Sequence, residues 1–551
     1  MTTKKEQKIL IVIPRYSITN NNFTNEINYN YNFPLGLGYI SSVLKQTDYH
    51  VDCLNLNHHK GYIEDIVTNA LCKHNYDYVC TGHVSAGYRI IEKIINTVHI
   101  HKSRPKTILG GIIVTSEPEL MFNSLNPDYI VIGEGENTII ELLEYLEHKG
   151  NIEEVDGIGY RDKNDNIVFT KQRKPITDLS ILPIPDFEGF EFEKKLKHQH
   201  TNDNYFNNVF DIPRAYPIMG SRGCPFQCSF CYHYNKFIER TIISIMEELN
   251  IMVKQYKINT VVLYDDCFST STERIYEFCE GINKLKKEIT WDLKWTCAMT
   301  VKTLDKEILK MMKDSGCDVI GYGFESYSSS VLKSMKKPIT PQLIDHALHE
   351  TLDAGIALAA NFIFGDIAET TETSNETLEY WKKNCKGQVA IFLIMPYPGS
   401  AIYNHCIEKG IIKDKLDFIK NDIIVTTFNM TNTMTCDEFE QLKNKMANYW
   451  KSYQKHVVPL SIKQQRKNTY TLKIKCPFCK KINVYNNCFI ENKLMFGFNL
   501  ICRSCPMRFE VESFLQNIRT SKPLHILKKL ILFDIFYLFI SKKIRRKLIS
   551  E

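Results

Sequence analysis

Several patterns are missing from this sequence, and each absence excludes a class of protein. Residues 1–6 lack the apolar region and the small-residue cleavage site of a secretory signal. The formal net charge is only +6 over 551 residues, and much of the excess lies at 542–547, so the chain lacks the global positive charge typical of nucleic-acid binding. With 44% hydrophobic and 24% charged residues, the composition fits neither a disordered chain nor a multi-span membrane protein. We therefore expect a cytoplasmic globular protein with no nucleic-acid partner.

Internal repeats are also absent, apart from an alternation of strand-like and helix-like segments. At about 100–200 residues per domain, a chain of this length has room for about three domains. The 18 cysteines would suggest a disulfide framework in a small secreted protein, but this chain is long and shows no export signal. Metal binding is therefore the better interpretation of the cysteines.

The N-terminal part, residues 8–150, has the pattern of a doubly wound α/β domain of the Rossmann or flavodoxin type. Its short β-branched runs predict five strands, at residues 9–13, 51–54, 78–80, 107–109 and 129–132. Helix-length amphipathic segments separate them, which predicts a parallel sheet with helices on both faces. Ligands bind such sheets at the carboxyl ends of the strands, where this sequence is rich in glycine.

A small hairpin and a linker are expected at residues 151–212, followed by a second series of strands and helices at 213–435. This second series contains six strand-like runs, at residues 218–220, 260–264, 291–295, 319–323, 361–364 and 389–392. Six parallel strands alternating with helices predict an open barrel.

The loop after the first strand of this second series contains three cysteines within eight residues, Cys224, Cys228 and Cys231. Soft thiolates suit iron and sulfur, and three ligands on a four-iron cluster leave one iron open to another ligand. A zinc site completed by His233 and a set of buried free cysteines are the alternatives. The spacing CxxxCxxC, with an aromatic residue before the last cysteine, favours the iron–sulfur cluster.

This loop resembles the signature loop of the radical S-adenosylmethionine (radical SAM) superfamily. Residues 264–268 and 321–326, together with the glycine-rich strand ends of the first domain, resemble the subgroup that also has a cobalamin (B12)-binding domain. The resemblance covers about residues 8–430. It implies a partial (β/α)6 barrel like that of a TIM barrel, holding a 4Fe-4S cluster. SAM would bind the open iron, and its reductive cleavage would give a 5′-deoxyadenosyl radical that abstracts hydrogen from a substrate.

The same resemblance implies roles for individual residues. Asp265 or Asp266 would hold the SAM ammonium group, Glu325 would bond a ribose hydroxyl, and Phe230 would pack near the adenine. For the two aspartates, a helix cap or a solvated turn is the alternative. After the fifth strand the chain departs from the family, which usually has a proline and a second glycine where Ile367 and Ala368 stand. This departure puts the shape of that loop in doubt, and not the reaction.

Cobalamin binding is a separate prediction from the resemblance. The implied contacts come from the strand-end residues Gly110, Gly111, Gly133, Glu134 and Gly135. The DxHxxG loop of other cobalamin proteins is missing, since His83 lacks the preceding aspartate and the glycine spacing, and we interpret His83 as an ordinary loop residue. The subgroup commonly binds cobalamin without that histidine. A domain that serves only as a scaffold is the alternative, and Ile113, where many relatives have a histidine, favours it mildly.

The C-terminal region, 436–551, contains two CxxC pairs, Cys476 with Cys479 and Cys502 with Cys505. Two such pairs predict a zinc ribbon at 472–512, with four thiolates in a closed structural site. Such a module could cap the barrel or dock a partner; an auxiliary iron–sulfur cluster is the alternative. The tail at 523–547 is apolar at 524–540 and then basic, and its apolar part is shorter than the ~20 residues of a spanning helix. We expect peripheral contact with an anionic membrane there, or else packing on the protein itself or a dimer contact.

Taken together, these patterns predict a radical SAM enzyme that uses cobalamin to modify an unactivated carbon, most simply by methyl transfer. Radical cyclisation, oxidation or rearrangement without methyl transfer is the second hypothesis, and a non-catalytic metal-binding interaction protein is the third. The expected partners are a small-molecule or lipid-like substrate and a reductant such as flavodoxin or ferredoxin. The sequence singles out no residue as a catalytic acid or base.

Overall fold

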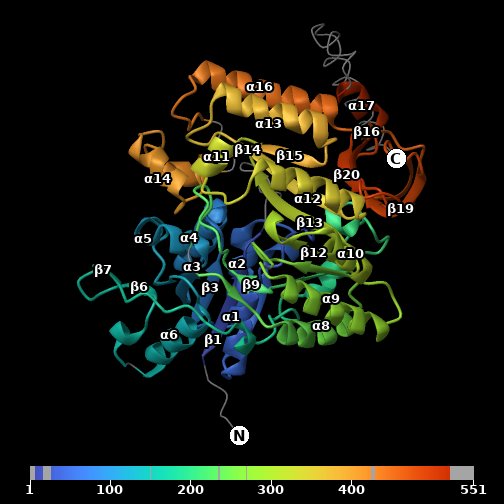
Figure 1. Cartoon of the computed structure of the whole chain (residues 1–551). Helices are drawn as coiled ribbons and strands as arrows, with labels where there is room; N and C mark the ends of the chain where they lie inside the picture. Colours follow the sequence, from blue (N-terminus) through green and yellow to red (C-terminus); the bar gives the residue numbers. More distant parts are fainter. Residues whose placement is uncertain are drawn as a thin grey trace, which may run out of the picture.

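The computed structural model describes residues 7–15, 26–148, 150–233, 236–268, 270–423 and 428–520. In Figure 1 the N-terminal part (blue to cyan) lies against the green and yellow middle part, and the C-terminal module (red) lies on the far side of that middle part. The middle part thus separates the two ends of the described chain.

The N-terminal part is a seven-stranded sheet in the order β2-β1-β3-β4-β5-β6-β7. The first five strands are parallel, as predicted, and β6 and β7 are the predicted hairpin, which extends the sheet in the antiparallel sense. The strands are β1 (Lys8–Ile13), β2 (His50–Asn55), β3 (Tyr78–Gly82), β4 (Lys106–Gly110), β5 (Tyr129–Val131), β6 (Ile158–Arg161) and β7 (Ile167–Phe169). The order reverses between β1 and β3, which is where doubly wound sheets bind their ligands.

Helices cover both faces of this sheet because its strands are apolar on both sides. Ile9, Ile11 and Ile13 pack with the helices on one face, and Leu10 and Val12 pack with those on the other. On the first face lie α1 (Leu35–Gln46) and α6 (Glu136–His148). On the second lie α2 (Ile63–Lys73), α3 (Tyr88–Ile100) and α5 (Pro118–Leu125), with the short α4 (Ile112–Ser116) at a strand end.

The middle part is the predicted open barrel of six parallel strands, in the order β15-β14-β13-β12-β11-β8. Its strands are β8 (Ala215–Ile218), β11 (Thr260–Leu263), β12 (Lys294–Ala298), β13 (Cys317–Glu325), β14 (Ala357–Phe364) and β15 (Val389–Leu393). The helices between them are α8 (Ile242–Tyr256), α9 (Thr272–Lys287), α10 (Lys306–Ser315), α11 (Ser329–Ser334), α12 (Pro341–Asp353) and α13 (Thr371–Asn384). The α/β fold class with a barrel in second place is therefore confirmed.

Two further segments complete the environment of the barrel. After β15 come α14 (Ala401–Glu408) and the long α16 (Cys436–Tyr453), which lies along α13 (Figure 1). Trp450 of α16 stacks on Trp381 of α13, with ring centroids 6.2 Å apart. Helix α16 also begins with a capping box between Thr435 and Glu438, which fixes where it starts.

The C-terminal module covers the amino ends of the last barrel strands. It consists of β16 (His456–Val457), β17 (Ser461–Arg466), β18 (Thr469–Lys475), β19 (Ile482–Phe489), β20 (Gly497–Ile501), β21 (Arg508–Glu512) and α17 (Phe514–Thr520). Ile501 packs on Val319 and Ala357, which begin the registered part of β13 and β14. Gln388, just before β15, accepts a hydrogen bond from the Arg508 backbone at 2.6 Å. The module therefore caps the barrel at the end opposite to its cysteine loop.

The loop after β14, where the sequence departs from the family, is held by a buried glutamate. Glu369 is fully buried, and its Oε2 accepts a hydrogen bond from the Gly365 backbone at 2.5 Å. Thr433 donates to the Glu369 carbonyl at 2.6 Å, which ties the loop to the segment before α16. Burial raises the pKa of Glu369 to about 8, so this carboxyl folds in its neutral form.

We predict that Glu369 makes stability fall as the pH rises. The pKa of Glu369 is higher in the folded chain than in the unfolded one. Its contribution to the free energy of unfolding is therefore complete below about pH 4.5 and is lost as the pH rises to about 8. The slope is up to about 1.4 kcal/mol per pH unit. Thermal unfolding of Glu369→Gln across this range should lack that slope. Equal slopes in the variant and the wild type would contradict this assignment.

Candidate functional site

A large cavity lies between the N-terminal sheet and the carboxyl ends of the barrel strands. Its volume is about 1460 Å³, above the ~300–1,000 Å³ of a pocket for one small ligand, so it has room for more than one bound molecule. Ala86 and Ile112 line it from the N-terminal part. The cysteine loop, the ends of β13, β14 and β15 and one side of α16 form most of the remaining wall.

All three cysteines of the loop, Cys224, Cys228 and Cys231, line this cavity. The loop starts at Gly223, whose φ of +72° allows the sharp turn out of the barrel strand. Its middle is held by backbone hydrogen bonds to the neighbouring barrel segments, from Ser229 N to the Met335 carbonyl and from Ile402 N to the Ser229 carbonyl. These hydrogen bonds therefore fix the backbone of the loop at the cavity wall.

The arrangement of these thiols fits a multi-iron cluster better than a single ion. Among the described residues, the groups that bring three or more ligand atoms within 4.8 Å of one another do not include this loop. His233, the alternative fourth zinc ligand, has its Nε2 at 3.0 Å from the Cys228 carbonyl. Burial raises the pKa of the Cys228 thiol to about 11, so its thiolate form requires bound cations. The assignment of Cys224, Cys228 and Cys231 as cluster ligands stays a prediction.

The two aspartates after β11 have different surroundings. Asp266 lies on the cavity wall next to Cys224, as a group that binds an ammonium must. Asp265 is buried behind the wall, where its Oδ1 accepts a hydrogen bond from Gly220 N at 2.7 Å. Burial raises the pKa of Asp265 to about 7, partly offset by the backbone donors at Gly220 and Ser221. Asp266 is therefore the better candidate for SAM, while Asp265 supports the start of the cysteine loop.

Glu325 lies on the cavity wall at the end of β13, where the sequence placed it. Its φ of +60° is unusual for a residue with a side chain and marks a strained strand end. Its Oε1 accepts from Lys337 Nζ at 3.1 Å and its Oε2 accepts from Asn361 Nδ2 at 3.2 Å. A Cβ at Gly323 would lie 2.0 Å from Oε1, so a side chain at this position would displace the carboxylate.

Lys337 is a residue that the sequence did not single out. It follows α11 and lines the cavity together with Glu325 and the cysteine loop. Its charge lowers the pKa of Cys228 against the larger effect of burial, so it stabilises negative charge on the thiolates. A lone lysine in a polar turn carries no pattern that distinguishes it from a surface lysine. Phe230, in contrast, was predicted and lies on the cavity wall.

The glycine-rich strand ends of the N-terminal sheet lie close to one another. A Cβ at Gly82 would lie 2.8 Å from the Gly110 carbonyl, and one at Gly111 would lie 2.9 Å from the His83 carbonyl. Backbone packing thus already requires Gly82 and Gly111, whatever binds there. Ile112, directly after them, is 47% exposed and lines the cavity, so the surface offered to a ligand here is apolar.

His83 is turned inward, as expected of an ordinary loop residue. Its Nδ1 accepts a hydrogen bond from Val84 N at 2.8 Å, and its ring lies where a Cβ at Gly87 would be. Burial lowers the pKa of His83 to about 4. His83 does not line the cavity, so it is not presented there as a ligand for cobalamin.

The segment from Gly133 to Glu136 connects the N-terminal sheet to the cysteine loop. Gly133 has a φ of +85°, and its backbone N–H donates to Thr115 Oγ1 at 3.0 Å. Gly135 packs closely on Ile40. Glu134 binds Arg222 at 2.9 Å and the Ile176 backbone at 2.6 Å, so both its oxygens have protein partners. The cobalamin contacts predicted for Gly133, Glu134 and Gly135, and for Gly110 and Gly111, stay predictions.

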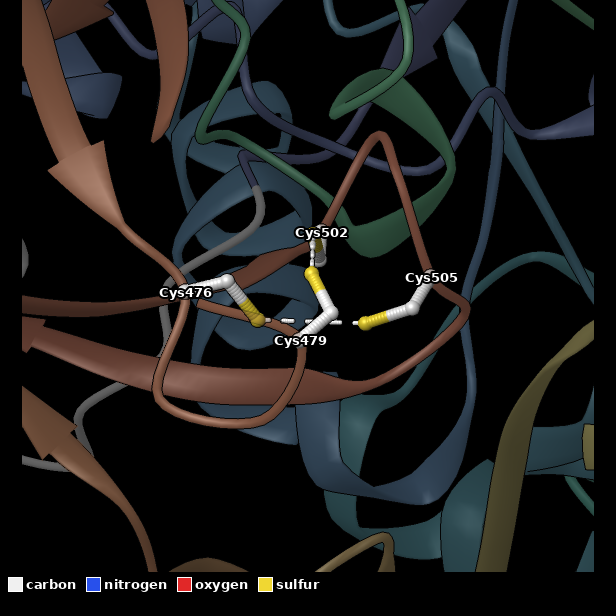
Figure 2. A group of neighbouring side chains, drawn as sticks. All are labelled: Cys476, Cys479, Cys502 and Cys505. Carbon is white, nitrogen blue, oxygen red and sulfur yellow. Dashed lines mark hydrogen bonds between the residues drawn. The ribbon is translucent and has the colours of Figure 1, made fainter. Parts of the chain in front are cut away.

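The four cysteines of the C-terminal module converge on one point (Figure 2). The sulfur atoms of Cys476 and Cys505 are 3.8 Å apart, and those of Cys479 and Cys502 are 3.7 Å apart. Zinc with bonds of about 2.3 Å in a tetrahedron places its sulfur ligands about 3.8 Å apart, so the group fits one zinc ion. In each CxxC pair the backbone N–H two residues after the first cysteine donates to its sulfur, which stabilises a thiolate.

We predict that Cys479→Ser removes the bound metal and loosens the module. Metal analysis of the wild type should find one zinc in addition to the loop cluster, and the variant should lack it. Because the module packs on the barrel, the melting temperature of the Cys479→Ser variant should be lower than that of the wild type by more than about 5 °C. Cys436→Ser, at an exposed cysteine, is the matched control. Additional iron and sulfide in place of zinc would support the auxiliary cluster instead.

This fold and site define a radical SAM barrel joined to a B12-type α/β domain, and family comparisons agree. The B12 binding domain family matches residues 29–143, and the Radical SAM superfamily matches residues 218–380. The chain thus contains a B12-binding-type domain followed by a radical SAM domain.

Sequence comparison with named proteins supports this domain assignment. An uncharacterized methyltransferase, PH0819, of Pyrococcus horikoshii is 27% identical over 69% of this chain and 79% of its own length. Cytidylyl-2-hydroxyethylphosphonate methyltransferase of Streptomyces wedmorensis is 21% identical over 74% of this chain and 83% of its own. The anaerobic magnesium-protoporphyrin IX monomethyl ester cyclase of Rubrivivax gelatinosus is 27% identical over 62% of this chain and 60% of its own.

Solved structures share the fold. The radical SAM methyltransferase TsrM of Kitasatospora setae, solved with cobalamin and a 4Fe-4S cluster, has a TM-score of 0.57 at 14% identity, over 73% of this chain and 75% of that one. The cobalamin-dependent radical SAM enzyme OxsB has a TM-score of 0.55 at 20% identity, over 75% of this chain and 56% of that one. At such identities the likeness establishes the fold alone.

Proposed function

We propose that this protein is a cobalamin-dependent radical SAM enzyme that modifies an unactivated carbon of a small molecule, with methyl transfer as the outcome. The observation that carries the proposal is that one cavity is lined by the three-cysteine loop on one side and, on the other, by Ala86 and Ile112, which follow strands β3 and β4 of the B12-type domain. The predicted cobalamin contacts Gly110, Gly111, Gly133, Glu134 and Gly135 do not line this cavity themselves. The methyltransferases among the relatives and TsrM among the structures support the same reaction.

In such a site the cofactors supply the reactive groups, and the protein's residues hold and orient them. When bound, a 4Fe-4S cluster supplies the electron that cleaves SAM, and cobalamin supplies a carrier for the methyl group. The protein's own residues bind, orient and exclude water. Cys224, Cys228 and Cys231 would hold the cluster, Asp266 would bind the SAM ammonium group, and Glu325 would accept a ribose hydroxyl. A reductant such as flavodoxin or ferredoxin has to deliver the electron.

A second outcome is supported by the cyclase of Rubrivivax gelatinosus, which is similar to 62% of this chain and is not named a methyltransferase. Radical cyclisation, oxidation or rearrangement uses the same cluster and SAM site. The mass of the product separates the two outcomes, because methyl transfer adds one methyl group and the others add none.

The cavity wall supports an apolar, lipid-like substrate. Phe392 is 57% exposed, Tyr397 50% and Ile112 47%, and all three line the cavity. Large apolar side chains exposed together in a hollow are typical of a binding surface for an apolar ligand. Helix α16 adds Met446 and Trp450 to the same wall.

Membrane contact by the apolar and basic tail stays a prediction, because residues 523–547 lie outside the described residues. Within the described residues, no helix is both long enough and apolar enough to span a bilayer.

We predict that Cys228→Ala abolishes SAM cleavage, because the two remaining cysteines, Cys224 and Cys231, cannot hold the cluster in place. After anaerobic reconstitution with iron and sulfide and reduction by dithionite, 5′-deoxyadenosine from SAM should fall at least about 100-fold. Cys72→Ala, at an exposed cysteine of α2, should keep wild-type cleavage. No cleavage by a fully loaded wild-type protein would contradict the proposed function.

We also predict that Phe392→Ala weakens the binding of apolar molecules to the cavity. ANS fluorescence titration should show an affinity reduced by about 3–10-fold. A bound ANS molecule would cover the exposed phenylalanine ring, and such an apolar contact contributes on the order of 1 kcal/mol or more. Tyr276→Ala, at a 43% exposed aromatic residue of α9 that does not line the cavity, should leave the affinity unchanged. Equal affinity in Phe392→Ala would argue against the apolar substrate.

A further inference from the structure

Arg222 links the cysteine loop to the N-terminal domain. It stands two residues before Cys224 in the short strand β9 (Ser221–Arg222), which pairs with β10 (Ile238–Glu239). Its guanidinium crosses to the segment between β5 and α6 of the other domain. There its Nη1 donates to Glu134 Oε1 at 2.9 Å, and its Nη2 pairs with Glu136.

Each partner in this contact, which we call the Arg222 clamp (Arg222, Glu134 and Glu136), is nearly covered. The side chains of Arg222, Glu134 and Glu136 are 15%, 7% and 5% exposed. The Arg222 guanidinium also lies over the Tyr39 ring at 5.6 Å, on α1 of the N-terminal domain. Glu134 in turn accepts from the Ile176 backbone at 2.6 Å, so the linker after the hairpin joins the clamp.

Burial distinguishes the clamp from two other ionic contacts between the described residues of these parts. Lys415 pairs with Glu117 at 3.0 Å and Lys420 with Glu92 at 3.0 Å, but the two lysines are 42% and 30% exposed. Exposed pairs contribute little because water screens them. Buried charge-assisted pairs fix geometry, and removing one partner leaves the others as uncompensated buried charges.

The position of the clamp joins two sites that the reaction requires close together. On one side, Gly223 and Cys224 follow Arg222 directly. On the other, Glu134 and Glu136 alternate with Gly133 and Gly135 at the carboxyl end of β5. A shift of the guanidinium therefore moves the cysteine loop relative to the B12-type strand ends.

We propose that Arg222 is a positioning residue that holds the cluster loop and the B12-type domain in a fixed mutual position through Glu134 and Glu136. The functional meaning of that position rests on the proposed function, whereas the mechanical coupling does not. The clamp acts through the cysteine loop and touches no reacting atom.

Amide hydrogen exchange tests the coupling without any cofactor or substrate. In Arg222→Met, exchange should accelerate at least about tenfold both at 220–232 and at 132–143, which are separated by more than 70 residues of chain. The double variant Glu134→Gln/Glu136→Gln changes only the N-terminal domain, yet it should accelerate exchange at 220–232 to the same extent. Arg222→Lys should restore part of the protection.

The matched control is Arg173→Met. Arg173 pairs with Glu141 of the same helix α6 but does not contact the cysteine loop, so exchange at 220–232 should stay at the wild-type rate. Unchanged exchange at 220–232 in Glu134→Gln/Glu136→Gln would overturn the proposal, even if Arg222→Met itself folds poorly.

A spectroscopic measurement on the loaded enzyme separates this proposal from the proposed function. Pulsed EPR between the reduced cluster and cob(II)alamin should give one narrow distance in the wild type and in Arg173→Met, and a broadened distribution in Glu134→Gln/Glu136→Gln. An unbroadened distribution would overturn the clamp. A wild type that retains no cobalamin would contradict the proposed function, while the exchange experiment still decides on the clamp.

Discussion

One buried guanidinium, Arg222, is the constraint on which the arrangement of the two large parts depends. Each part builds its own sheet from strongly apolar strands, and apolar side chains of both parts pack together in shared clusters. Such packing is non-directional, so it does not by itself set one relative position of the two sheets. The cavity exists only because the cysteine loop of the barrel meets the strand ends of the B12-type domain. Arg222, bound to Glu134 and Glu136, lies at that junction and makes the relative position of the parts specific.

The remaining walls of the cavity come from segments that close the barrel. Helix α16 lies along α13 and covers the cavity on one side, with the Trp381 and Trp450 stack between them. At the opposite end, the cysteine module covers the amino ends of β13 and β14 through Ile501. The barrel is thus closed at its base, while the cavity at its mouth faces the N-terminal domain and α16.

The sequence predicted the elements whose signals are local. The β-branched runs at 9–13 and 78–80 identify strands by themselves, and the spacing of the two CxxC pairs predicts the four-cysteine group that the structure brings together. The cluster site at Cys224, Cys228 and Cys231 is likewise predicted from a local spacing, and it stays a prediction. Contacts between distant segments were not predictable in this way. Lys337 and Arg222 look like ordinary basic residues until the fold brings Glu325 and Glu134 to them. For the same reason, the sequence could not tell that Asp265 turns inward while Asp266 faces the cavity.

The central claim is that a single cavity holds an iron–sulfur cluster with SAM on one wall and cobalamin on the other. The most direct measurement is to reconstitute the full chain anaerobically, remove unbound molecules by gel filtration, and record the cobalamin spectrum and the EPR spectrum of the reduced cluster with and without SAM. We expect about four loop-cluster irons and one retained cobalamin per chain, and a cluster spectrum that changes when SAM binds. Cobalamin that elutes apart from the protein, or a cluster spectrum that SAM leaves unchanged, would contradict it.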